Sequence, residues 1–441
     1  MTVKKSKLIM EPFTGSVPGA QNVYITPEGP IRTINGQIPM FPLEYSGWQE
    51  EELSWHDNCY IHSGLNPFIF HEIKGDDFLE FMEAMTISTY RQFPIGKARH
   101  AVFCNEEGKI RMDGILVRRG EDEFLAMHLL DPAVLNQEMG NKYKFVSRDV
   151  SNERFFYQLC GPRSLEVIEA AARQDFHELK FMYSTDAVID GADVLILRTS
   201  MAGTLGYEIH GKAEDAVKVY KRVMQVGEDY DLHPIGRHAY RNTHTEGSIA
   251  QGGIHFAFYN QNAVSSTTGS FGEDCPYRYA SPIDVGWEKM ISFKHDFIGK
   301  AALQSEMNSH HNTLVHLIWN KEDILKVAST WFEKDSCDVM DMVEDFDYVH
   351  SNRHVHLDAV YDHDRLIGAA SGRMLSPKNH EMMSLCVIDQ DYAAEGKKVE
   401  VLWGSPGSRQ MRIRAAVLPV PYIKECRNDS FDVSLIPRPV F

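Results

Sequence analysis

The 441-residue chain is long enough for two or three domains, and its 43% hydrophobic and 24% charged residues are an ordinary globular composition. Its formal net charge of -17 argues against binding to nucleic-acid phosphates or to an anionic membrane surface. No apolar run approaches the ~20 residues of a membrane helix. The seven cysteines are odd in number and contain no C-x-x-C spacing, which is typical of reduced thiols. We therefore expect a cytoplasmic protein without a nucleic-acid or membrane partner.

Secondary-structure signals alternate along the first part of the chain. Residues 1 to about 45 are rich in Gly, Pro and Thr and predict an extended arm. Further along, the patterns predict a helix over 48–59, a strand over 70–75 and a helix over 76–85. From His100 the pattern changes to strands, with a Glu-Glu-Gly hairpin signal inside residues 101–119 and a third strand over 123–130.

The alternation of strands and helices continues to about residue 240. A strand over 155–162 closes on Gly-Pro, and a helix is predicted over 164–173. Residues 214–230 form an amphipathic pattern in which Val219, Val223 and Val226 share one stripe. This arrangement predicts an α+β body.

The remainder of the chain has a different pattern. Residues 252–285 predict ordered loops, whereas residues 312–441 contain short strand-like runs such as 397–404 and 411–420. We predict two regions, a catalytic region over 1–311 and a smaller all-β domain over 312–441. The runs His354–Asp358 and Asp362–Asp364 resemble metal-ligand sets, but alternation along a strand places them on a solvated face, so we expect no metal site. Lys321-Glu322-Asp323 is expected to be solvated as well.

Five collinear segments resemble the glycine-cleavage T-protein superfamily. They are YQLCGPRSLEVIE (157–169), MAGTLGYEIHG (201–211), SPIDVGWEKMISFKHDFIGKAAL (281–303), HDRLIGAASGRMLSPKNHEMMSLCVI (363–388) and RIRAAVLPVPY (412–422). Each is weak alone, but five in register cover nearly the whole chain. The resemblance implies a three-lobed, cloverleaf-like fold around a tetrahydrofolate site, with a β-rich last lobe.

Three other segments, 44–61, 223–240 and 314–324, resemble the aryl O-demethylase branch of this superfamily, typified by vanillate and 3-O-methylgallate O-demethylases. That branch moves a methyl group from an aromatic methyl ether to N5 of tetrahydrofolate. The implied partner is therefore a small methyl donor, a methoxyarene, and the products are a phenol and 5-methyltetrahydrofolate.

The resemblance also suggests which residues hold the cofactor. Glu208 matches the carboxylate that accepts the two adjacent N–H donors of the pterin, an arrangement that a carboxylate can satisfy bidentately. Gln158 offers both a donor and an acceptor for the remaining pterin edge. Its neighbour Tyr157 is included in the predicted cofactor site. Without the motif context, Glu208 would read as a solvent-facing residue at a strand end.

Two further residues are candidates for the chemistry. Tyr240 matches a Tyr proposed as the acid that protonates the departing phenolate, because a phenol belongs to the same pKa class. Asp113 matches the Asp near N5 and N10 in the T-protein, where a carboxylate could stabilise positive charge. The plainer readings are a core Tyr and a turn Asp before Gly.

The substrate wall departs from the vanillate enzyme. The resemblance places Ile38, Asn66, Met127 and Leu129 at substrate-binding positions. Leu129 stands where an Arg is expected to hold a benzoate carboxylate, and a Leu cannot supply that bidentate clamp. We therefore expect a substrate that is not held as vanillate is.

Two other functions stay open. The first is methyl or aminomethyl transfer from a non-aromatic donor such as a sulfonium, an N-methyl amine or an aminomethyl-lipoyl protein, which would leave Tyr240 without a phenolate to protonate. The second is folate binding without catalysis, as in relatives linked to tRNA modification. Those relatives carry a Cys-containing motif that the corresponding segment 287–303 lacks.

Overall fold

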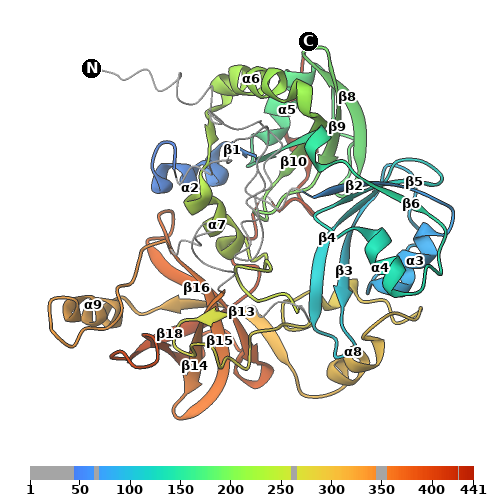
Figure 1. Cartoon of the computed structure of the whole chain (residues 1–441). Coiled ribbons are helices and arrows are strands. Elements are labelled where there is room, and N and C mark those ends of the chain that lie inside the picture. Colours follow the sequence, from blue (N-terminus) through green and yellow to red (C-terminus); the bar gives the residue numbers. More distant parts are fainter. Residues whose placement is uncertain (1–43, 64–68, 260–265, 344–354, 426) are drawn as a thin grey trace.

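The computed structural model describes residues 44–63, 69–259, 266–343, 355–425 and 427–441. Three β-sheets form three groups of elements arranged around the middle of the molecule (Figure 1). This architecture confirms the predicted three-lobed α+β fold. The predicted N-terminal arm lies outside the described residues, apart from its last two positions.

The first lobe is a six-stranded sheet in the order β11-β1-β7-β10-β9-β8. Its strands are β1 (Cys59–His62), β7 (Arg154–Cys160), β8 (Ser184–Ile189), β9 (Ala192–Arg198), β10 (Gly206–Lys212) and β11 (Leu232–Pro234). Helices α5 (Ser164–Ala172) and α6 (Ala216–Gly227) cover one face. Val219 and Val223 of α6 are fully buried there and Val226 packs against them, which confirms the predicted amphipathic stripe.

The second lobe is a five-stranded antiparallel sheet in the order β3-β4-β5-β2-β6. Its strands are β2 (Phe70–Lys74), β3 (Ala98–Cys104), β4 (Ile110–Arg118), β5 (Glu123–Met127) and β6 (Val146–Asp149). Helix α3 (Phe78–Met85) packs its aromatic residues into the core of this sheet, and α4 (Pro132–Glu138) adds Leu135. The predicted hairpin between β3 and β4 is present, with Val102 opposite Asp113.

The third lobe is built around a closed sheet, because β14 pairs with both β15 and β17. Its strands are β12 (Thr267–Thr268), β13 (Asn312–Trp319), β14 (Val355–Asp362), β15 (Arg365–Ser376), β16 (Glu381–Asp389), β17 (Lys398–Trp403) and β18 (Met411–Pro419). The lobe also contains one helix that the sequence did not predict, α9 (Lys321–Thr330).

The predicted boundary at residue 312 coincides with the start of β13 at Asn312. Two segments cross it, however. Strand β12 pairs with β14 of the third lobe, and residues 427–438 return from the third lobe to the first. The two-region division stays a prediction.

Helices α2 (Trp48–Asp57) and α7 (Arg237–Glu246) lie between the lobes and pack against each other, and α7 also contacts β15 and β16. Among the described residues, the other helical elements are α8 (Lys300–Met307) and the short 3-10 turns Ser151–Glu153, Ala213–Asp215, Glu228–Tyr230, Glu288–Met290, Gln390–Tyr392 and Val433–Leu435. No helix within the described ranges combines the length and apolar character that crossing a membrane requires.

Candidate functional site

The centre of the candidate site is formed by three residues on adjacent strands of the first sheet. In the register of β1, β7 and β10, His62 lies opposite Gln158, and Gln158 lies opposite Glu208. Residues directly opposite each other in antiparallel strands point to the same face, so the three polar side chains form one row. All three are at least 96% buried.

Glu208 is held as a buried carboxylate. Burial alone would raise its pKa, but the hydrogen bond from His210 and the nearby His128 outweigh that effect and hold the pKa of Glu208 below its usual value. His210 lies two residues further along β10, on the same face, with Nε2 3.0 Å from Oε2 of Glu208. Gln158 Nε2 donates to the other carboxylate oxygen at 3.3 Å. Glu208 therefore presents ionised acceptor oxygens inside the protein.

The polar row continues from Gln158 to His62. Burial lowers the pKa of His62 to about 4, so its ring is neutral near pH 7. Its Nε2 lies 3.1 Å from Oε1 of Gln158, which also accepts from the Tyr60 hydroxyl at 3.4 Å. An amide oxygen only accepts hydrogen bonds, so this contact assigns the proton of neutral His62 to Nε2.

Tyr240 joins the same row from helix α7. Its ring makes edge contacts with His62 and with His244, each with ring centroids 4.8 Å apart. Tyr240 is fully buried, and burial lowers the pKa of His244 to about 3. The predicted phenolic acid thus lies between two neutral imidazoles, next to the predicted pterin-binding pair.

Asp113 occupies a different place. It lies on β4 of the second lobe, where its Oδ2 is 2.7 Å from Nε2 of His100. The His100 ring in turn packs edge-on against Trp287, with centroids 4.9 Å apart. Both side chains of the Asp113–His100 pair are about one-fifth exposed, so the carboxylate is accessible from outside the core. The structure does not place it in the polar row of the first sheet.

Three further predicted site residues, Tyr157, Met127 and Leu129, are buried in apolar surroundings. Tyr157 points to the opposite sheet face from Gln158, and its hydroxyl donates to the carbonyl of Ala216 at 2.7 Å. Met127 is buried between the first two sheets, and Leu129 lies in the core of the second lobe. The predicted substrate residues Ile38 and Asn66 lie outside the described residues. These assignments stay predictions.

Sequence reasoning missed the histidines of the site. His210 had an available signal, since it lies two residues after Glu208 in the same strand and must share its face. His62 had none before the pairing of β1 with β7 was known, because strand register is set by contacts distant in sequence.

Three groups of side chains in the described part of the chain bring possible metal-ligand atoms within 4.8 Å of one another. They are Glu52, His56 and Glu246; Glu169, Asp175 and His177; and His310, Asp389 and Asp391. Each group is linked internally by at least one hydrogen bond, which occupies atoms that could otherwise bind a metal. Of the runs weighed from the sequence, His356 pairs with Asp358 at 3.1 Å, and His354 lies outside the described residues.

A groove of about 1410 Å³ lies between the first and second lobes. Its lining includes Leu125 of β5, Leu195 of β9 and His210 of β10. It therefore extends to the histidine that binds Glu208.

Comparison with known proteins identifies the family. Residues 42–253 match the model of the GCVT N-terminal domain. The chain is 36% identical over 424 residues to a sesamin methylene transferase from Sinomonas sp. (strain No.22), covering 90% of this chain and 94% of that protein. The chain belongs to the glycine-cleavage T-protein superfamily.

Further relatives agree with this superfamily membership. A syringate O-demethylase from Sphingobium sp. (strain NBRC 103272 / SYK-6) is 27% identical over 431 residues, covering 89% of this chain and 92% of that protein. An aminomethyltransferase from Bacillus cytotoxicus is 24% identical over 399 residues, covering 88% and 92%. The crystal structure of glycine cleavage system aminomethyltransferase T from Bartonella henselae has the same fold, with a TM-score of 0.64 and 17% identity over 90% of this chain and 94% of that one.

Membership of the T-protein superfamily confirms several expectations from the sequence. The protein is a folate-dependent methyltransferase, its cofactor is tetrahydrofolate, and it lies with the aryl O-demethylase branch. Superfamily membership does not specify the methyl donor, because the relatives named above act on different compounds.

Proposed function

We propose that the protein moves the methyl group of a methoxylated aromatic compound to N5 of tetrahydrofolate, giving a phenol and 5-methyltetrahydrofolate. The observation that carries this proposal is the buried position of Tyr240, in contact with His62 in the polar row that includes Glu208 and Gln158. A phenol group beside a folate-binding pair suits a reaction whose leaving group is a phenolate.

The residues of the row fit the pterin of tetrahydrofolate. Glu208 is ionised and accepts two hydrogen bonds in the structure, from Gln158 and His210. A carboxylate has about four lone-pair positions, so capacity remains for the two adjacent N–H donors of a pterin. Gln158 is held from three sides, by His62, Tyr60 and Glu208, which fixes the orientation of its amide. Glu208 and Gln158 would therefore hold the pterin, and the bound cofactor would supply N5 as the methyl acceptor.

The side chains around Tyr240 favour it as the proton donor. The C–O bond of the ether breaks as the methyl group leaves, and the departing oxygen needs a proton. His62 and His244 are neutral because burial lowers the pKa of each, to about 4 and about 3. No imidazolium at these two positions competes with the Tyr240 hydroxyl. A positioned acid of this kind typically contributes 10²–10⁴-fold to the rate.

The apolar character of Met127 and Leu129 bears on the donor. Both are fully buried among hydrophobic residues, and neither can pair with a carboxylate. Holding a benzoate in a buried site requires a cation or several hydrogen bonds. We therefore propose a methoxyarene without a carboxylate at the position that vanillate-type enzymes clamp.

Methylene transfer is a second candidate, favoured by the 36% identity to a sesamin methylene transferase. The two reactions differ in the oxidation state of the transferred carbon. A methyl group yields 5-methyltetrahydrofolate, whereas a methylene group yields 5,10-methylenetetrahydrofolate and involves both N5 and N10. The aminomethyltransferase relatives keep a non-aromatic donor as a further possibility.

Product analysis under anaerobic conditions separates these candidates. The purified protein and tetrahydrofolate would be incubated with methoxyarenes lacking a carboxylate, with methoxybenzoates and with methylenedioxyarenes, and the folate products identified by mass spectrometry. We expect 5-methyltetrahydrofolate from the first group, with Tyr240→Phe as the matched variant that removes a single hydroxyl. Formation of only 5,10-methylenetetrahydrofolate would establish the second candidate, and no methylated folate from any methoxyarene would contradict the first.

A further inference from the structure

The C-terminal segment leaves the third lobe and completes the first. After β18 the chain runs back across the molecule, and its end lies beside the first lobe (Figure 1). Val433 is buried in the hydrophobic core of that lobe, and Phe431 and Ile436 pack against it. The segment 427–438 is therefore part of the packing around the sheet that carries Glu208.

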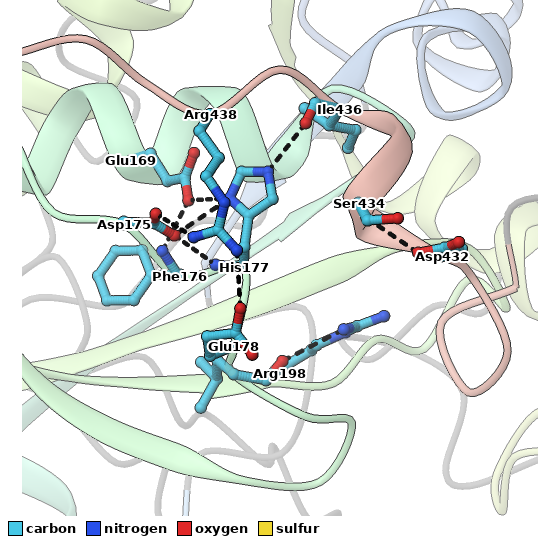
Figure 2. A network of polar contacts seen from close by, with 11 residues as sticks. Glu169, Asp175, Phe176, His177, Glu178, Arg198, Asp432, Ser434, Ile436 and Arg438 are labelled. Atoms are coloured by element: carbon cyan, nitrogen blue, oxygen red, sulfur yellow. Dashed lines mark hydrogen bonds and ion pairs between the residues drawn. The ribbon is translucent and has the colours of Figure 1, made fainter.

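The far end of this segment is fixed at the surface. Arg438 pairs with Asp175 at 2.5 Å and with Glu178 at 2.7 Å, and His177 Nε2 lies 3.0 Å from the carbonyl oxygen of Ile436 (Figure 2). The Arg438 side chain is more than half exposed, and such ion pairs usually contribute less than about 1 kcal/mol. These contacts therefore hold the far end of segment 427–438 at the surface, away from the part of the segment that contacts β10.

The near end makes buried contacts with the strand that carries Glu208. Asn428 Oδ1 accepts from Arg198 Nε at 3.1 Å, and Asn428 Nδ2 donates to the carbonyl of Gly206 at 3.1 Å. Arg198 is the last residue of β9 and Gly206 the first of β10, so Asn428 bridges the two ends of the β9–β10 connection. Asn428 is 4% exposed and Arg198 6%, which makes these hydrogen bonds costly to lose. Glu208 is two residues beyond Gly206.

The preceding residue contacts the helix that carries Tyr240. Arg427 Nη1 donates to the carbonyl of Gly247 at 3.1 Å, and Gly247 immediately follows α7. The β9–β10 connection also packs closely against Gly247, because a Cβ on Gly247 would lie 2.3 Å from the carbonyl oxygen of Ala202. Two consecutive residues of the C-terminal segment thus join the end of the Tyr240 helix to the start of the Glu208 strand.

We propose that Arg427 and Asn428 form a positioning clamp that fixes the predicted pterin carboxylate relative to the predicted phenolic acid. Neither residue is a catalytic group in this inference, which rests on the proposed function for its two reference points, Glu208 and Tyr240. Small displacements of two reacting groups lower the reaction rate strongly. A link between the strand of Glu208 and the helix of Tyr240 should therefore affect the rate. The clamp acts through Gly206 on one side and Gly247 on the other.

Two variants of Asn428 separate positioning from mere attachment of the segment. Asn428→Ala removes both side-chain contacts. Asn428→Asp keeps an acceptor for Arg198 and adds charge pairing, but it has no donor for Gly206. Arg438→Ala is the matched control, because it loosens the same segment without touching β10. The measurements are the Kd for tetrahydrofolate by calorimetry and hydrogen exchange of residues 199–212 in the ligand-free protein.

We expect both Asn428 variants to raise the Kd about tenfold, the effect of one buried hydrogen bond, and to accelerate exchange at 199–212. We expect Arg438→Ala to stay within about twofold of the wild type in both measurements, since its exposed pairs contribute little. If Asn428→Ala does not fold, Asn428→Asp alone decides the question, since it retains the contact with Arg198.

Wild-type affinity and exchange in Asn428→Asp would overturn the clamp. Failure of the wild-type protein to bind tetrahydrofolate is a distinct outcome, because it would contradict the proposed cofactor site. In that case the exchange measurement still decides whether Asn428 orders β10, and unaltered exchange would overturn the clamp as well.

Discussion

Two buried carboxyl groups, Glu52 of α2 and Glu246 of α7, should contribute very differently to the free energy of unfolding. Burial and the charge of Glu246 raise the pKa of Glu52 well above its usual value, so Glu52 holds the proton of the pair in preference to Glu246. Burial acts in the same direction on Glu246, but the hydrogen bond and charge of His56 and the hydroxyl of Ser376 hold its pKa below the usual value. Glu246 accepts from His56 at 2.9 Å and from Ser376 and Asn379 at 2.7 Å each. The pair therefore carries one negative charge, and this charge resides on Glu246.

Neutral substitutions should have very different effects at these two positions. Glu246→Gln removes the buried charge that three donors require and should lower the free energy of unfolding by about 3 kcal/mol. Glu52→Gln replaces a neutral acid by a neutral amide that can still accept from Trp55, so its cost should stay below about 1 kcal/mol. Asp57→Asn is the matched control on α2, the helix that also carries Glu52, because it breaks only the exposed ion pair with Lys378.

Urea unfolding at pH 7, followed by tryptophan fluorescence, measures these differences as shifts of the midpoint. Exchange protection of α7 gives a local measurement that does not depend on two-state unfolding of a three-lobed protein. Equal losses in Glu52→Gln and Glu246→Gln would refute the assignment of the charge to Glu246. If Asp57→Asn lowered the free energy of unfolding as much as Glu246→Gln, burial of the carboxylate could not explain the cost of Glu246→Gln.

Three further predictions concern the site and its surroundings. Glu208→Gln should raise the Kd for tetrahydrofolate about 100-fold, close to the upper range for a charged hydrogen bond; calorimetry on the folded variant giving an unaltered Kd would remove Glu208 from the cofactor site. Tyr240→Phe should lower kcat by about 10²–10³ with a methoxyarene and leave the Kd for tetrahydrofolate alone, whereas full turnover would favour a non-aromatic donor. Burial lowers the pKa of His316 to about 4, so the unfolded state takes up the proton first and stability falls as the pH drops from about 6.5 to 4. His316→Gln should flatten this decline by on the order of 3 kcal/mol, measured as urea midpoints against pH, and an identical slope in the variant would contradict it.

The elements with strong local patterns were predictable from the sequence. The stripe of Val219, Val223 and Val226 specifies both the existence and the buried face of α6, because helical periodicity is a local property. The Glu-Glu-Gly turn likewise specifies the β3–β4 hairpin. Helix α9 was missed because Lys321-Glu322-Asp323 resembles a solvated charge run. Asp323 is in fact buried, and its bond with Arg414 holds its pKa well below the usual range.

The candidate site was only partly predictable, because the contacts that assemble it join residues distant in the sequence. Glu208 and Gln158 could be chosen from their motifs, but only strand pairing brings them face to face with His62. Tyr157 shows the reverse case, since it is adjacent to Gln158 in sequence and yet points to the other sheet face. Contacts of the C-terminal segment, such as Asn428 with Gly206, join residues more than 200 positions apart and leave no signal in a single sequence.

The distribution of charge along the polar row limits the chemistry that each end can perform. Glu208 is ionised, so the end near β10 favours a ligand that donates hydrogen bonds. His62 and His244 are neutral, so neither of these two rings beside Tyr240 supplies a cation that would bind a phenolate tightly. An oxygen that leaves as an anion beside these neutral rings is stabilised when it takes a proton, and the Tyr240 hydroxyl is suited to give that proton. Proton transfer would then be coupled to bond breaking, so a donor whose leaving group is already a weak base should depend less on Tyr240 than a methoxyarene does.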